Sequence, residues 1–173
     1  MGDLKWYVIT GTPSSGKTTI ISRLSEMGFQ TCSEAARFLI DEEISKGKTL
    51  EEIRINEIEF QRKTLELKIK SEDKLPKDKI VFIDRGIPDS IAYFQFYGQD
   101  VQEVLKFCHK RYKKIFFLEA LPFEKDYARI EDEKTARKLS ELLKKTYLDL
   151  GYEVISVPNM SIKERINFIL SNL

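Results

Sequence analysis

Residues 11–18 of the chain read Gly-Thr-Pro-Ser-Ser-Gly-Lys-Thr and match the phosphate-binding pattern G-x-x-x-x-G-K-[ST]. Consecutive backbone N–H groups in such a turn can surround a triphosphate, and the flanking glycines permit approaches that a Cβ atom would forbid. Lys17 can contribute a positive charge to the β- and γ-phosphates, and the Thr18 hydroxyl can bind Mg²⁺. The nucleotide-binding residues are expected to be Gly11, Thr12, Pro13, Ser14, Ser15, Gly16, Lys17, Thr18 and Thr19. We therefore expect the chain to bind ATP or GTP together with Mg²⁺.

The segments around this loop predict alternating strands and helices. Five apolar runs are the expected strands: residues 5–10, 30–32, 79–84, 114–119 and 153–157. Helices are expected at residues 16–27, 34–46, 49–71, 88–97, 100–112 and 133–150, and from residue 161 onward. Apolar residues run consecutively in at least four of the strands, which indicates a parallel sheet buried on both faces. We expect one three-layer α/β domain over residues 1–173.

Composition argues against several classes of protein. Lys and Arg number 29 against 28 Asp and Glu, so net charge favours neither nucleic acid nor a membrane surface. Cys32, Cys108 and His109 form no zinc-binding pattern, and the two thiols suit a reducing compartment. No stretch approaches the ~20 apolar residues of a membrane span, and the run at residues 6–10 is too short for a signal peptide. A cytoplasmic protein without nucleic-acid binding or membrane insertion is expected.

Charged residues follow the expected second and third strands, at the sheet edge where α/β proteins bind ligands. Asp84 can complete a magnesium site, and Arg85 can bind substrate or stabilise charge on a transferring phosphoryl group. Glu34 can accept a proton from an acceptor hydroxyl, with Arg37 one helical turn further on. Ordinary structural interpretations stay open: a surface salt bridge for Arg85, and an acid favoured by the helix dipole for Glu34.

A charged stretch after the fourth strand predicts a lid at residues 122–135. Its closure would exclude water and could bring Arg129 onto the phosphates, whereas the alternative is a solvated loop. Asp89 is a further candidate for substrate binding, although an acid at this position also suits a helix cap.

In combination these motifs resemble the NadR-like P-loop proteins, named for the ribosylnicotinamide-kinase domain of a bacterial regulator of NAD biosynthesis. The matching segments are residues 11–18, 33–37, 82–86, Arg129 with Glu131-Asp132, and 151–153 leading to Val157-Pro158. The arrangement is also similar to that of deoxynucleoside kinases. The resemblance implies a P-loop kinase fold with parallel strands in the order 2-3-1-4-5. It further implies Glu34 as the base, Asp84 as a magnesium or base carboxylate, and Arg85 and Arg129 as charge-stabilising groups.

The favoured function is a small-molecule kinase that transfers the γ-phosphoryl group of MgATP to a hydroxyl of a nucleoside-like or other small metabolite. Two alternatives stay open. One is a regulator that uses ATP or GTP to order its lid for a partner. The other is a hydrolase of nucleotides or organic triphosphates, in which Glu34 or Asp84 orients water. No Asn-Lys-x-Asp sequence occurs, which disfavours a GTPase with that guanine-binding motif.

Overall fold

The computed structural model describes residues 4–109, 111–119 and 132–173. Within these ranges the strands form one five-stranded sheet with the order β2-β3-β1-β4-β5, and every neighbouring pair is parallel. The strands are β1 (Trp6–Gly11), β2 (Gln30–Cys32), β3 (Val81–Asp84), β4 (Lys114–Leu118) and β5 (Val154–Val157). The predicted fold class and strand order are confirmed.

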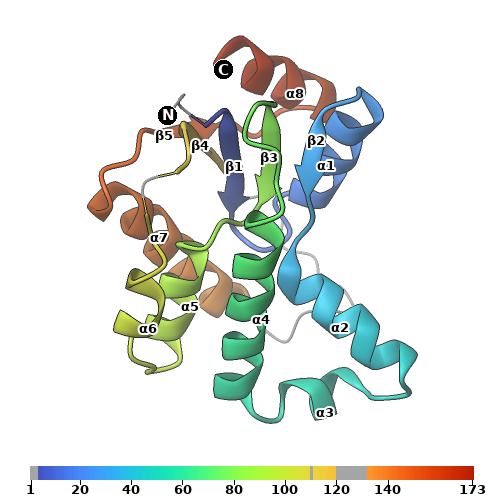
Figure 1. The fold of residues 1–173 in the computed structure, drawn as a ribbon, viewed down its shortest axis with the longest axis vertical. Helices are drawn as coiled ribbons and strands as arrows, with labels where there is room; N and C mark the ends of the chain where they lie inside the picture. The colour runs from blue at the N-terminus through green and yellow to red at the C-terminus, as the bar shows by residue number, and fades with distance from the viewer. Residues whose placement is uncertain (1–3, 110, 120–131) are drawn as a thin grey trace.

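Helices cover both faces of the sheet (Figure 1). They are α1 (Lys17–Glu26), α2 (Ala35–Ser45), α3 (Leu50–Arg54), α4 (Glu57–Glu72), α5 (Asp89–Phe96), α6 (Gln102–Leu105), α7 (Glu133–Asp149) and α8 (Ile162–Ser171). Side chains alternate along β1, because successive residues of a strand point to opposite faces. Tyr7 and Ile9 therefore share a core with α1 and α8, whereas Trp6 and Val8 share one with Tyr147 of α7.

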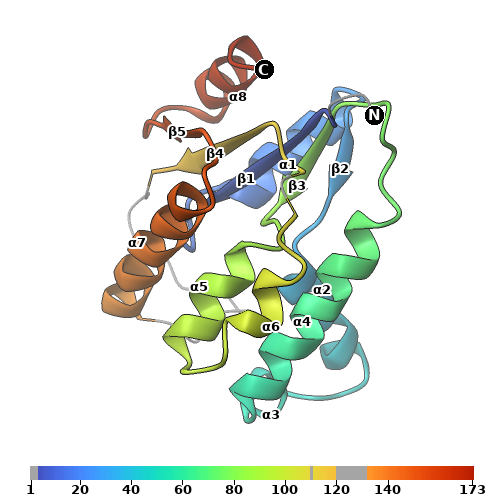
Figure 2. The same cartoon turned by 60° about the vertical axis from the view of Figure 1, so that its left-hand side comes forward.

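A second group of helices extends from the sheet. In both views α2, α3, α4 and α5 lie together at one end of the molecule, away from α8 (Figures 1 and 2). Leu39 and Ile40 of α2 pack against Phe60 of α4 in a small apolar cluster. This packing holds α2 and α4 against each other beside the carboxyl ends of β2 and β3.

The helix expected at residues 49–71 is wrong in one respect, because the structure divides it into α3 and α4. Its predicted beginning is confirmed, since Thr49 and Glu52 form a reciprocal capping box. The break occurs at Asn56, whose side chain accepts a 3.1 Å hydrogen bond from the backbone N–H of Glu59. Asparagine competes in this way with the helical backbone and therefore starts a new helix.

The helix expected at residues 100–112 is also wrong beyond its first turn, because α6 ends at Leu105. Tyr112 is buried two residues before β4, and its hydroxyl donates to Glu72 at 2.7 Å. The chain must straighten to reach this buried site and enter the sheet, so tertiary contacts override the local preference for helix.

No helix in the described part of the chain is long and apolar enough to cross a membrane. The predicted lid lies mostly outside the described residues, which resume at Asp132. There the Asp132 side chain caps α7 by accepting a 2.8 Å hydrogen bond from the N–H of Thr135.

Candidate active site

The loop at residues 12–16 connects β1 to α1 and has the backbone shape that its sequence predicts. Gly11 adopts φ +140°, and a Cβ atom there would lie 2.4 Å from the carbonyl oxygen of Leu118 in β4. Ser14 and Gly16 are left-handed, with φ of 64° and 85°. Such reversals turn successive N–H groups toward a common point, which is the geometry of an anion-binding loop.

Lys17 begins α1 and is buried against this loop. Its Nζ donates to the carbonyl oxygens of Gly11 and Thr12 at 3.5 and 2.9 Å, and to the Ser15 hydroxyl at 3.2 Å. Thr18, the next residue, is exposed on the first turn of α1. The predicted phosphate-binding residues therefore lie together at the end of β1, with the ammonium at the centre of the loop.

Arg165 of α8 holds the loop from behind and was missed by the sequence analysis. Its side chain is fully buried, and Nη1 donates to the carbonyl oxygen of Ser15 at 2.6 Å. Nε donates to the carbonyl oxygen of Pro158 at 3.1 Å, and Nη2 to that of Glu119 at 3.3 Å. Arg165 thus ties the loop to the segments that follow β4 and β5. Because Arg165 lies 150 residues from Ser15 in the sequence, no local pattern could predict this contact.

Replacing Arg165 by methionine is expected to destabilise the protein by roughly 2–4 kcal/mol, because the buried carbonyl oxygen of Ser15 and two partly buried carbonyl oxygens lose a charged donor. The affinity for ATP should fall as well, since the loop loses its support at Ser15. Urea unfolding and nucleotide calorimetry would measure both. Lys163→Met, at an exposed position of the same helix, is the control. Unchanged stability and affinity in Arg165→Met would contradict this role.

Asp84 ends β3 beside Ile9 of β1 and is 2% exposed. Its Oδ1 is buried and accepts no hydrogen bond from any described residue. Burial, and next the negative charge of Glu34, raise the pKa of Asp84 to about 7, while Lys17 and Arg85 oppose this shift. A cation near Oδ1 would relieve both the burial cost and the repulsion.

Asp84 therefore fits a magnesium site, and Thr18 supplies a hydroxyl beside the same loop. The described residues contain no group of three or more His, Cys, Asp or Glu side chains arranged for a metal ion. Mg²⁺ bound with nucleotides usually takes one or two protein ligands and completes its coordination with phosphate oxygens and water.

The raised pKa of Asp84 predicts a dependence of stability on pH. An unfolded aspartate titrates near pH 4 and the folded Asp84 near 7, so folding takes up a proton between these values. The contribution of Asp84 to the free energy of unfolding is therefore fully present below about pH 4 and is lost as pH rises to about 7. Relative to Asp84→Asn, the wild type should lose roughly 2–4 kcal/mol over this range without nucleotide or Mg²⁺. Denaturant unfolding from pH 4.5 to 8 checks this, and parallel curves would contradict it.

Arg85 follows Asp84 in a left-handed conformation, with φ of 63°. Its N–H donates to the carbonyl oxygen of Ile9 at 3.1 Å. Its guanidinium is buried, and Nε donates to Glu34 and Nη1 to Asp89, each at 3.2 Å. The alternative of a surface salt bridge is therefore wrong. Arg85 thus has a strained backbone conformation, and its buried guanidinium points toward Glu34.

Asp89 lies behind Arg85 and is fully buried. It accepts hydrogen bonds from the hydroxyls of Thr10, at 2.5 Å, and Tyr147, besides the one from Arg85. The N-cap of α5 is Pro88, so the capping interpretation of Asp89 is not what the structure shows. Asp89 is also absent from the cavity lining, where a substrate contact would place it. Its carboxylate positions Arg85 instead.

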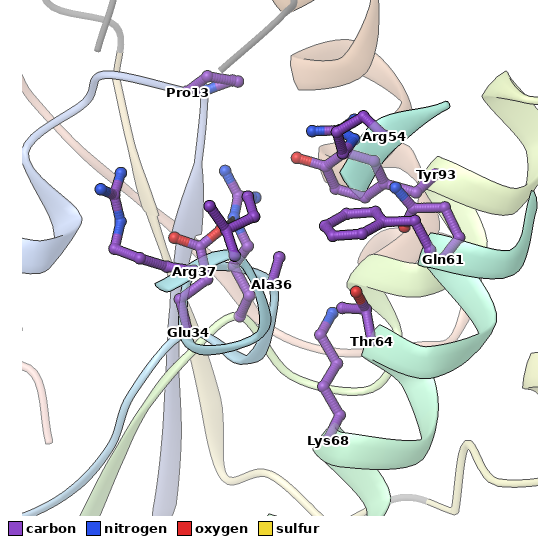
Figure 3. Close-up of a pocket in the computed structure, with 12 residues that line it drawn as sticks. Pro13, Glu34, Ala36, Arg37, Arg54, Gln61, Thr64, Lys68 and Tyr93 are labelled. Carbon is purple, nitrogen blue, oxygen red and sulfur yellow. Dashed lines mark hydrogen bonds and ion pairs between the residues drawn. The ribbon is translucent and has the colours of Figure 1, made fainter. Parts of the chain in front are cut away.

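One cavity brings the phosphate loop and these charged residues together. Its lining consists of Pro13, Glu34, Ala36, Arg37, Ile40, Arg54, Phe60, Gln61, Thr64, Lys68, Arg85 and Tyr93. Figure 3 shows Glu34, Ala36 and Arg37 on one side of the cavity, and Gln61, Thr64 and Lys68 of α4 on the other. The predicted Glu34, Arg37 and Arg85 therefore face one space, whereas Arg129 lies outside the described residues.

The α4 wall was missed by the sequence analysis. Gln61, Thr64 and Lys68 recur at spacings of three and four residues, so they share one helix face. That face is buried in the structure although its residues are polar. The local signal was this stripe of polar residues at helical spacing.

The comparisons with known proteins agree with this architecture. A family model described as an AAA domain matches residues 6–165. No curated protein matches the chain. Among solved structures, the NadR protein in complex with NR aligns with 97% of this chain at a TM-score of 0.70 and 16% identity. This chain covers only 49% of that one, or about half its length.

Two further structures match over nearly their whole lengths. Deoxyadenosine kinase from M. mycoides with bound dCTP has a TM-score of 0.68 at 13% identity, covering 96% of this chain and 97% of its own. Thymidylate kinase from Ehrlichia chaffeensis has a TM-score of 0.64 at 16% identity, covering 99% of each chain. Identities this low show a shared fold, which is that of P-loop kinases.

Proposed function

The chain belongs to the AAA domain family. We propose that it is a phosphotransferase. In this proposal it transfers the γ-phosphoryl group of MgATP to a hydroxyl of a small metabolite. The observation that carries the proposal is the cavity whose lining joins Pro13 of the phosphate loop to Glu34 and Arg85. A site for nucleotide binding alone has no need of a carboxylate held by a buried guanidinium beside the loop.

The donor half of the proposed site is the phosphate loop. Its N–H groups and the N-terminus of α1 would surround the phosphates, and Lys17 would contact the β- and γ-phosphate oxygens. Thr18 and Asp84 would hold Mg²⁺, which neutralises charge on the phosphates when bound. Asp84 suits this role better than that of base, because it is nearly inaccessible and does not line the cavity.

The acceptor half is the cavity. Glu34 lines it, and the 3.2 Å hydrogen bond from Arg85 fixes its carboxylate. In the proposed reaction the acceptor oxygen forms a bond to the γ-phosphorus as the bond to the β-phosphate oxygen breaks. The hydroxyl proton passes to Glu34, and ADP leaves. Arg85 would stabilise the charge that develops on the transferring group, with Arg129 of the proposed lid as a second cation.

Similar proteins support this reading. The NadR protein was also solved in complex with NAD and AMP-PNP, an ATP analogue, and aligns with 97% of this chain at a TM-score of 0.68 and 16% identity. The other two matches described above are kinases by name. By this likeness we propose ATP as the donor for the present chain and a small compound with a hydroxyl group as the acceptor.

Incubation with MgATP and a panel of nucleosides, nucleotides, vitamins and hydroxy acids tests the proposal. The expected result is one phosphorylated acceptor with an equal amount of ADP. Release of inorganic phosphate without any acceptor would identify a hydrolase instead. Tight nucleotide binding without phosphorylation of any acceptor would remove support for a kinase, and capture of a partner dependent on the γ-phosphate would then indicate a regulator.

A further inference from the structure

Lys68 is a buried cation on the wall of the cavity. It is 5% exposed, and its Nζ donates to the carbonyl oxygen of Gly86 and the hydroxyl of Ser90, both at 3.2 Å. Both acceptors are neutral, and no described acid lies within ion-pair distance of Nζ. Burial, the largest cause, lowers the pKa of Lys68. An ammonium group has three donors, so one remains for a group outside these two contacts.

Thr64 lies one helical turn before Lys68 and is 4% exposed. Its Oγ1 is buried and makes no hydrogen bond to any described residue. Threonine hydroxyls within helices commonly bond to a carbonyl of the preceding turn, and a buried hydroxyl without a partner is costly. Figure 3 shows this hydroxyl beside the ammonium end of Lys68, at the same side of the cavity.

Two neighbouring cations of the lining are already balanced by acids. Arg54 forms a salt bridge with Glu57 at 2.8 Å. Arg85 is paired with Glu34 and Asp89, each at 3.2 Å. Lys68 therefore differs from both, because its charge is buried and no carboxylate of the described residues forms an ion pair with it. Buried charges in proteins are normally paired, and a ligand can supply the missing partner.

We propose that the acceptor carries an anionic group, a phosphate ester or a carboxylate, which binds to Nζ of Lys68 and Oγ1 of Thr64. Calling this ligand the acceptor rests on the proposed function, whereas the anion site itself rests on the two side chains. The arrangement separates the two ends of the ligand. In this proposal its anionic end lies on α4, and its hydroxyl end reaches across the cavity to Glu34.

The proposed site would also distinguish an anionic ligand from a neutral one. A neutral analogue of the same shape would leave Lys68 and Thr64 buried without the partner that the anion provides. Sites built around buried polar groups reject ligands that leave them unpaired. We therefore expect the anionic member of a matched pair to bind at least about tenfold more tightly than the neutral one.

Calorimetry on the full chain saturated with MgAMP-PNP tests this without turnover, since the donor site is then filled. The probes are nucleosides against their 5′-monophosphates, and hydroxy carboxylic acids against their methyl esters. The two arms distinguish a phosphate from a carboxylate ligand. Equal affinities within every pair, or no binding by any anionic member, would overturn the inference. Failure of phosphoryl transfer despite selective anion binding would instead count against the proposed function alone.

Two variants assign the selectivity to α4. Lys68→Met keeps the aliphatic stem and should reduce the preference for the anionic member to near unity. Thr64→Val keeps the shape and should weaken anion binding about three- to tenfold. Its melting temperature should be unchanged or higher, because the hydroxyl has no partner among the described residues. Lys70→Met, at an exposed position of α4, is the control and should change neither property.

A merely structural role of Lys68 would give a different result. Lys68→Met would then weaken the charged and neutral members of each pair by the same factor, and this outcome would overturn the inference. If Lys68→Met does not fold, Thr64→Val decides the question alone. Unchanged anion affinity in that variant would then contradict the proposed site.

Discussion

Replacing Lys17 by alanine is expected to reduce kcat/KM for ATP by about a thousandfold or more, since a single preorganised cation at a transferring phosphoryl group contributes this much. Lys17 is buried at the loop, where its ammonium contacts Thr12 and Ser15 at 2.9 and 3.2 Å. The loop would keep its N–H groups but lose the charge that they surround. Steady-state kinetics and nucleotide calorimetry measure the loss.

The control for this variant is Lys70→Ala, which removes an exposed lysine from α4. The contacts of Lys17 also stabilise the loop, so the fold of the variant must be checked. We expect circular dichroism to show that Lys17→Ala remains folded. An unchanged nucleotide affinity and an unchanged rate would rule out the phosphate-binding role of residues 11–18.

The second large effect is expected from Glu34→Gln, which keeps the size of the side chain and removes its basicity. We expect kcat to fall about 10²- to 10⁴-fold, the usual contribution of general acid–base catalysis. The KM for ATP should change little, because Glu34 lines the acceptor cavity rather than the phosphate loop. The remaining amide oxygen can still accept from Arg85, so the geometry should persist.

Glu66→Gln, at an exposed position of α4, is the matched control and should retain full activity. Whether Glu34→Gln lowers kcat alone or also the affinity for ATP decides between a role as base and a role in the metal site. If Glu34→Gln weakens ATP binding as strongly as it slows turnover, Glu34 belongs to the metal site and the assignment of the base is wrong.

The fold and the backbone shape of the loop at residues 11–18 could be predicted because their signals are local. Residues 11–18 carry the backbone requirements of phosphate binding in their own sequence, and every strand except β2 appears as a run of mostly apolar residues. Asp84 and Arg85 could be placed at the ligand-binding edge for the same reason, since they directly follow an apolar strand. The helix break at Asn56 could not, because the capping box at Thr49 favours one continuous helix.

The acceptor half could be predicted only in part, because its chemistry depends on burial. In sequence, Thr64 and Lys68 are ordinary residues of an amphipathic helix, and only the packing of α4 encloses them. Asp89 was predicted to contact substrate, whereas the structure places it outside the cavity lining, where it accepts hydrogen bonds from Thr10, Tyr147 and Arg85. Arg165 reaches the loop from α8 at the other end of the chain. Distant contacts of this kind leave no spacing that a sequence pattern can detect.

Several side chains of the site are arranged at a cost to stability. Asp84 is buried with an unpartnered oxygen beside the negative charge of Glu34, and Arg85 has a left-handed backbone. Strain and buried charge of this kind are concentrated where proteins bind and transform ligands. Arg85 lines the cavity and Asp84 directly precedes it in sequence, which supports a catalytic rather than a structural purpose.

The most direct test of the central claim follows the γ-phosphate of labelled ATP. We expect the label to enter an organic phosphate ester in equal amount to ADP, and Glu34→Gln to slow this transfer while ATP still binds. Appearance of the label only as inorganic phosphate would contradict the account, as would tight ATP binding from which the label never leaves.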